Sequence, residues 1–196
     1  NGMKLEPWMM PTVLLVVDTP IYAIGVVKIL SQEANRISGG WNNEIVDSSY
    51  SAITGGGGEY GTVGEDGDSN GNMISGGETS TISGGKKNRI RGNTGSSGHT
   101  ISGGIENTIE VSETQYHTIT GGYDNSAEGQ GTVVSGGELN RVIGTNSLAF
   151  GQNAVTFWDH SMVVNLLGGV DDPDADLLTG TEVGEFVVVT ADSFRF

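Results

Sequence analysis

The sequence predicts an all-β fold, a parallel β-solenoid of about seven coils, on three observations. Glycine supplies 33 of the 196 residues, more than twice the roughly 7 % of an average protein, without the strict triplet of collagen. The motif [Ile/Val]-[Ser/Thr]-Gly-Gly occurs seven times. No part of the repeats carries a sustained apolar period of about 3.6 residues, which a helix would need. We therefore expect thin stacked layers rather than one large globular core.

The repeat has a fixed half and an elastic half. In five copies of the motif, two residues and an asparagine follow the glycines, and a small or apolar residue lies eight positions after the first residue of the motif, as Ile109 does after Ile101. The stretches that join these units vary from seven to eleven positions. A solenoid with insertions at its corners has this pattern. The seven copies begin at Ile37, Ile53, Ile74, Ile82, Ile101, Ile119 and Val134, and the five asparagines are Asn43, Asn88, Asn107, Asn125 and Asn140.

Local chemistry accounts for the fixed half. A segment such as Thr-Ile-Ser forms a short strand with its apolar side chain on one side and its two hydroxyls on the other. Gly-Gly permits positive φ and a tight reversal. The asparagine tolerates the left-handed region and closes the corner before the next strand.

The number of strands in each coil follows from counting apolar positions. Fourteen of them between residues 37 and 150 give seven two-stranded coils that average about sixteen residues. Ile74 and Ile82 are only eight residues apart, so in this arrangement the glycine corners change edge around residues 74–90. A three-faced prism with about eighteen residues in each coil, the distance from Ile101 to Ile119, is the alternative.

Three segments follow from this organisation. Residues 1–36 are expected to be an apolar strand segment that caps the stack or takes part in assembly, residues 37–157 the glycine-rich solenoid, and residues 158–196 a C-terminal β cap or assembly segment. The first contains the strand-like stretches TVLLVV and IYAIGVVKI, and the last contains MVVNLLGG and GEFVVVTADSFRF. Because exposed strands invite pairing with other chains, we expect self-association through both ends.

One apolar stretch raises the alternative of a membrane segment. Residues 8–30 approach the length of a membrane span, but Asp18, Pro11 and Pro20 interrupt them. We therefore expect two strands around a turn at Pro20 rather than a membrane span.

The amino-acid composition of the chain limits the classes of molecule that it is expected to bind. The chain carries 24 acidic and 9 basic residues, for a net charge of −15, which repels both nucleic acid and anionic lipid. It contains no cysteine, so disulfides, thiolate metal sites and cysteine nucleophiles are excluded. We expect neither nucleic acid nor membrane as a partner.

Calcium is the one cofactor that the sequence suggests. Asp66, Asp68, Asn70 and Asn72 supply oxygens at alternate positions around a glycine at the sixth place, as at the start of a calcium-binding loop. The glutamate expected at the twelfth place is replaced by Gly77. The competing interpretation is a solvated corner insertion.

Other polar residues follow the repeat. His99 and His117 each precede a repeat isoleucine by two positions, which predicts stacked surface histidines rather than a metal pair. Hydroxyls beside the core positions are expected to form a flat ladder, as on ice-binding solenoids and on other exposed β faces. The candidate carboxylates for a glycan-cleaving enzyme have no evident partner. The hydroxyl residues are Thr81, Thr100, Thr118 and Thr132, and the carboxylates are Glu106, Glu110 and Glu113.

Residues 146–155, NSLAFGQNAV, resemble the head repeat of trimeric autotransporter adhesins, whose units have the pattern Asn-Ser-x-Ala-x-Gly-x-x-Ala. The matching residues are Asn146, Ser147, Ala149, Gly151 and Ala154. The Ser-Gly-Gly-x-x-Asn units resemble a looser variant found in bacterial surface and fibre proteins. The resemblance implies a left-handed parallel β-roll, often a homotrimer, displayed on a surface for adhesion or as a spacer.

These observations together predict a non-enzymatic structural subunit of an extracellular fibre or cell-surface adhesin, with itself as partner in a trimer or filament. The alternative is a glycan- or calcium-binding module that uses corner loops such as residues 65–72 and 91–100. A third interpretation, a polysaccharide-active β-helix enzyme, depends on the unpartnered glutamates.

Overall fold

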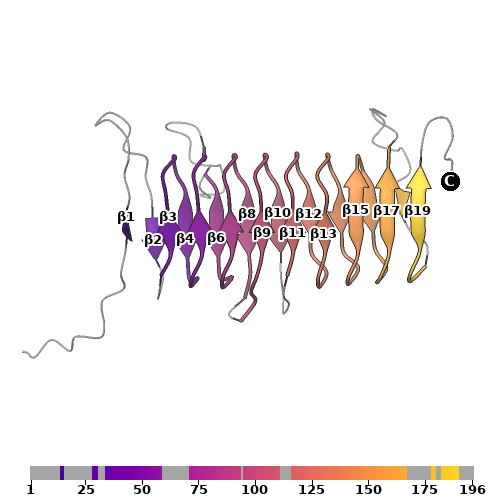
Figure 1. Cartoon of the computed structure of the whole chain (residues 1–196), viewed down its shortest axis with the longest axis horizontal. Helices are drawn as coiled ribbons and strands as arrows, with labels where there is room; N and C mark the ends of the chain where they lie inside the picture. The colour runs from indigo at the N-terminus through magenta and orange to yellow at the C-terminus, as the bar shows by residue number, and fades with distance from the viewer. Residues whose placement is uncertain are drawn as a thin grey trace, which may run out of the picture.

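The protein folds into a stack of two-stranded parallel coils, seen side-on in Figure 1. The computed structural model describes residues 14–15, 28–30, 34–58, 71–93, 95–110, 116–166, 178–179 and 182–189. Every described strand pairs in parallel, and none of the described residues is helical. The predicted all-β parallel solenoid is therefore confirmed, and the two-stranded coil replaces the three-faced alternative. No described helix is long and apolar enough to cross a membrane.

Odd-numbered strands form one sheet, which we call sheet A. Its strands are β1 (Leu14–Leu15), β3 (Arg36–Ile37), β5 (Ala52–Ile53), β7 (Thr81–Ile82), β9 (Thr100–Ile101), β11 (Thr118–Ile119), β13 (Val133–Val134), β15 (Leu148–Gly151), β17 (Met162–Asn165) and β19 (Phe186–Val189).

Even-numbered strands form the opposite sheet, sheet B. Its strands are β2 (Lys28–Leu30), β4 (Glu44–Val46), β6 (Met73–Ser75), β8 (Arg89–Arg91), β10 (Thr108–Glu110), β12 (Ser126–Ala127), β14 (Arg141–Val142), β16 (Ala154–Thr156) and β18 (Leu178–Thr179). The fourteen strands from β3 to β16 make the seven predicted coils, with seven strands in each sheet.

The core is a double column of aliphatic side chains, one from each strand from β3 to β17. In the middle of the stack, Ile101 lies in register with Ile82 and Ile119 in sheet A, and all three are 0 % exposed. The register places Ile74 in sheet B, between Ile45 and Ile90 on the neighbouring strands. The glycine corner after Ile74 therefore lies on the other edge from most of the rest, as the eight-residue spacing to Ile82 requires.

An asparagine column closes the edge at which the chain passes from sheet A to sheet B, which we call the asparagine edge. The Nδ2 of Asn107 donates to the carbonyl oxygens of Gly103 (3.1 Å) and Gly122 (3.0 Å) and to Oδ1 of Asn88 (3.1 Å). Its Oδ1 accepts the backbone and side-chain N–H groups of Asn125 at 3.1 and 2.9 Å. Stacked amides of this kind satisfy buried polar groups in six of the seven coils, and in the seventh the backbone N–H of Ala154 donates to Asn140. The column consists of Asn43, Asn72, Asn88, Asn107, Asn125 and Asn140.

The stack continues beyond the predicted boundary at residue 157. Strand β17 pairs with β15 over four residues, and β19 pairs with β17 in the same way. The described C-terminal strands thus add further layers of the same parallel sheet. Of the apolar N-terminal stretches, β1 and β2 extend sheets A and B at the other end.

Candidate functional site

The predicted calcium ligands do not gather in the described part of the chain. Asn72 is 0 % exposed and belongs to the asparagine column, where its Oδ1 accepts the N–H groups of Asn88 at 3.0 and 3.2 Å. Its oxygen is therefore already engaged inside the coil. Asp66, Asp68 and Asn70 lie outside the described residues, so calcium binding by them stays a prediction. Among the described residues, no group of three or more His, Cys, Asp or Glu side chains is placed to hold a metal.

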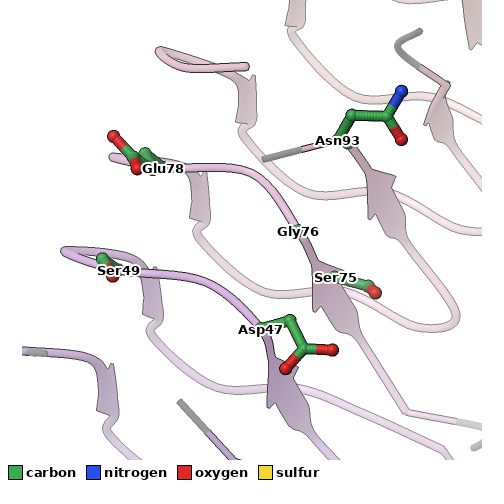
Figure 2. Close-up of a pocket in the computed structure, with 7 residues that line it drawn as sticks. Asp47, Ser49, Ser75, Gly76, Glu78 and Asn93 are labelled. Atoms are coloured by element: carbon green, nitrogen blue, oxygen red, sulfur yellow. The ribbon is translucent and has the colours of Figure 1, made fainter. Parts of the chain in front are cut away.

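A pocket of about 470 Å³ opens at the opposite edge, where the chain passes from sheet B to sheet A. Figure 2 shows its polar lining on successive coils, with Asp47 after β4, Ser75 at the end of β6 and Asn93 after β8. Glu78 adds a second carboxylate, and Asp47 and Glu78 are both exposed. The pocket thus offers carboxylate, hydroxyl and amide oxygens to a hydroxylated or cationic ligand.

The predicted corner loop at residues 91–100 contributes residues both to this pocket and to the interior. Gly92 and Asn93 line this pocket. His99, from the same loop, lies in the interior instead. Of the described residues of this loop, Gly92 and Asn93 therefore contribute to the pocket.

The candidate catalytic glutamates have separate basic partners. The carboxylate of Glu106 lies 2.9 Å from Nζ of Lys87, and that of Glu110 lies 3.4 Å from a guanidinium nitrogen of Arg91. The hydrogen bond from Lys87 lowers the pKa of Glu106. Glu106 precedes β10 and Glu110 ends it, and Glu113 lies outside the described residues. Each described carboxylate is thus part of a surface ion pair between neighbouring coils.

The histidines stack as predicted, but inside the protein rather than on its surface. The rings of His99 and His117 are 5.0 Å apart and 24° from parallel, and both residues are 0 % exposed. The Nδ1 of His117 lies 2.7 Å from the hydroxyl of Thr132, whereas both ring nitrogens of His99 lack a hydrogen-bond partner. Burial lowers the pKa of each imidazole to about 4, because the charged form loses its hydration. The pair is therefore a neutral part of the interior at pH 7.

The outer face of sheet A carries no charged side chain in the described strands from β5 onward. Its first part, which we call the hydroxyl zone, presents small side chains on five successive strands. Its second part, the apolar zone, covers the last three. The hydroxyl zone consists of Ala52, Thr54, Thr81, Ser83, Thr100, Ser102, Thr118, Thr120, Val133 and Ser135, and the apolar zone of Leu148, Phe150, Met162, Val164, Phe186 and Val188.

The predicted threonine ladder is right in three of its four members. Thr81, Thr100 and Thr118 are in register on adjacent strands. Thr132 is 0 % exposed and points inward to His117, and Val133 takes its place on the outer face. The ladder therefore gives way to apolar residues earlier than predicted.

Sheet B differs sharply from sheet A on its outer face. Arg141 makes a two-pronged contact with Glu128, at 2.7 and 3.0 Å, and Arg91 pairs with Glu110. From β5 onward, the described outer faces of the two sheets thus differ in charge, with ion pairs on sheet B and uncharged side chains on sheet A.

Three comparisons, with models of protein families, with curated proteins and with solved structures, found no match. The likeness to adhesin head repeats therefore rests on sequence motifs, and the candidate sites on the geometry described above.

The apolar zone was not predicted from the sequence, although a signal for it was present. In the early repeats the residues on either side of the core isoleucine are Thr and Ser, as around Ile101. In LAF and MVV, at residues 148–150 and 162–164, both flanking residues are apolar. Since alternate residues of a strand share a face, that change marks an apolar outer surface.

Proposed function

We propose that the protein is a non-enzymatic structural subunit of an extracellular fibre or cell-surface adhesin, and that it associates with copies of itself through its terminal β segments. The observation that carries this proposal is the apolar zone at the C-terminal end of the stack. Phe150 is 40 % exposed and Phe186 is 54 % exposed on that surface. Contiguous exposed apolar surface is characteristic of protein–protein contacts.

Charge supports a second copy as the occupant of the apolar zone. Two chains with a net charge of −15 repel each other over most of their surfaces. An uncharged face allows close approach without burying unpaired carboxylates. Among the described strands, β19 is the last of sheet A, so its outer backbone edge adds hydrogen-bonding groups next to the apolar zone. The extended stack in Figure 1 is the shape expected of such a subunit.

Sedimentation and negative-stain electron microscopy test the proposal. We expect the purified protein to form filaments or discrete trimers, and Phe186→Glu to reduce it to monomers, because a carboxylate would have to be buried in the contact. Tyr50→Glu is the matched control, since Tyr50 is similarly exposed, at 57 %, and lies far from Phe186 in the sequence. Monomers alone at high concentration of the unmodified protein would contradict the proposal.

The second candidate function is a glycan- or calcium-binding module, which the pocket of Asp47, Ser75 and Asn93 favours. Calcium binding predicts a rise in melting temperature with added calcium, because a ligand that binds only the folded state stabilises it. The rise should disappear in the double variant Asp66→Ala, Asp68→Ala and persist in Asp47→Asn if the insertion holds the ion. The opposite pattern would assign the ion to the pocket.

A further inference from the structure

The hydroxyl zone of sheet A forms a regular two-column array. Thr81, Thr100 and Thr118 form one column, in exact register between neighbouring strands. The backbone bonds Ser83 N–Ile101 O and Ser102 N–Ile119 O, both 3.0 Å, continue that register to the second column. Adjacent parallel strands lie about 4.8 Å apart, and residues i and i+2 of a strand are about 7 Å apart. The array therefore repeats in two directions with fixed spacings.

The hydroxyls of this array are unengaged. Within the described part of the chain, the hydroxyls of Thr81, Ser83, Thr100, Ser102, Thr118 and Thr120 make no hydrogen bond to the protein. The inward hydroxyls behave differently, since Ser147 Oγ donates to Trp158 O at 2.9 Å and accepts Ser161 N at 3.0 Å. The outer hydroxyls are thus available to hydrogen-bond a partner.

The array is also held rigidly. On each strand of the zone, the residue between the two outward side chains is a fully buried isoleucine or valine, such as Ile101 or Val134. The asparagine column fixes the separation of the coils at one edge. A partner that matches the spacing would therefore bind without the conformational cost of ordering a flexible surface.

The chemistry of the face selects among periodic partners. A mineral surface requires charged side chains, and the hydroxyl zone has none among its ten described residues. A crystalline polysaccharide is generally bound by flat aromatic rings that stack on its sugars, and no aromatic residue belongs to the zone. Neutral hydroxyl groups in regular register fit ordered water, whose oxygen rows in hexagonal ice repeat at distances of the same order.

We propose that the hydroxyl zone of sheet A is an ice-binding surface, on which ranks of threonine and serine hydroxyls take positions in the oxygen lattice of an ice crystal. The partner is crystalline water, recognised by periodicity rather than by a pocket. This activity is independent of self-association, because it uses the strands β5 to β13 and not the apolar zone.

Ice-affinity partitioning and thermal hysteresis of the full chain test the proposal. We expect the unmodified protein to enter growing ice and to hold back crystal growth. In Thr100→Tyr the ring stands above the flat face, so both effects should be lost. Thr108→Tyr is the matched control, because Thr108 has the same place before a core isoleucine, Ile109, but on the charged sheet B. It should keep both effects.

Circular dichroism establishes that the variants are folded, and Ser102→Tyr, at an exposed position, replaces Thr100→Tyr if that variant does not fold. Absence of ice partitioning in the unmodified protein would overturn the proposal, as would equal loss in Thr108→Tyr. If Thr100→Tyr instead changes the sedimentation of the protein and leaves its ice partitioning intact, the face is a contact between copies, and the proposal fails. Phe186→Glu should abolish assembly and preserve ice partitioning, which separates this inference from the proposed function.

Discussion

Acid should destabilise the protein through the buried pair of His99 and His117. Burial lowers the pKa of both imidazoles from 6.5 to about 4 in the folded state. Between these pH values the unfolded chain binds protons that the folded chain does not. Stability is therefore complete above about pH 7 and falls as the pH drops through 6.5 toward 4.

The size of the effect follows from the same pKa values. One pH unit corresponds to about 1.4 kcal/mol, so the difference between 6.5 and about 4 amounts to about 3 kcal/mol for each histidine. The charge of His99 further lowers the pKa of His117, because a second cation 5.0 Å away, from ring to ring, is unfavourable. The second protonation should therefore cost more than the first.

Guanidinium chloride unfolding at a series of pH values between 8 and 4 measures the effect. Ser80 and Thr132 hold the equivalent inward position on neighbouring coils, so the double variant His99→Thr, His117→Thr should fit the coil. Its unfolding free energy should lose most of the pH dependence seen in the unmodified chain, and each single variant should lose about half. The pH slope, not the absolute stability, is the readout, because removal of the rings also removes packing. An equally steep acid loss in the double variant would refute the reasoning.

Three further predictions concern stability, measured by thermal and denaturant unfolding. Gly104→Ala should prevent folding or lower stability far more than Gly103→Ala, since a Cβ on Gly104 (φ +86°) would overlap the carbonyl oxygen of Gly122, whereas a Cβ on Gly103 meets nothing within 4 Å; equal losses would mean that strain in φ alone matters. Asn107→Ala should cost about 3 kcal/mol, because it leaves the carbonyl oxygen of Gly103 and the backbone N–H of Asn125 without their hydrogen-bond partner, and a loss below about 1 kcal/mol would show that water replaces the amide. Thr156→Val should stabilise by about 1 kcal/mol, because Thr156 is 0 % exposed and its hydroxyl has no partner; a loss would indicate an undetected partner.

The fold was predictable because its determinants are local and repeated. The eight-residue step from Ile101 to Ile109 and the elastic stretches between units favoured seven two-stranded coils, and the structure decided between these and the three-faced prism. The seven-copy motif also indicated that the corner after Ile74 had to change edge. Handedness stays an expectation from the adhesin resemblance, since no short-range pattern in the residues determines it.

The interior polar residues were harder to predict, and strand parity explains why. His99 lies two positions before Ile101, and Thr132 two before Val134, so their side chains point to the same side as the core residue. Asn72 stands in the same relation to Ile74. The spacing of oxygens in a calcium loop obscured that relation, although Asn107 and Ile109 repeat it.

The outer face of sheet A could be predicted from the sequence only in part. The apolar zone follows from the alternation in residues 148–150 and 162–164, whereas the identity of its occupant does not. The pocket beside Asp47 likewise depends on three turns from separate coils, whose lengths vary along the chain. Insertions at the edges follow no repeat, so their arrangement could not be read from the motif.

The asparagine column also sets how much length the chain obtains from its residues. Successive members are 15 to 19 residues apart from Asn72 to Asn140, yet each coil advances the stack by only about 4.8 Å. The same sixteen residues in an α-helix would extend about 24 Å. The coil therefore gains less length per residue than a helix does. What each added coil provides is one more strand in each of the two sheets, so added residues enlarge the two outer faces more than they lengthen the stack.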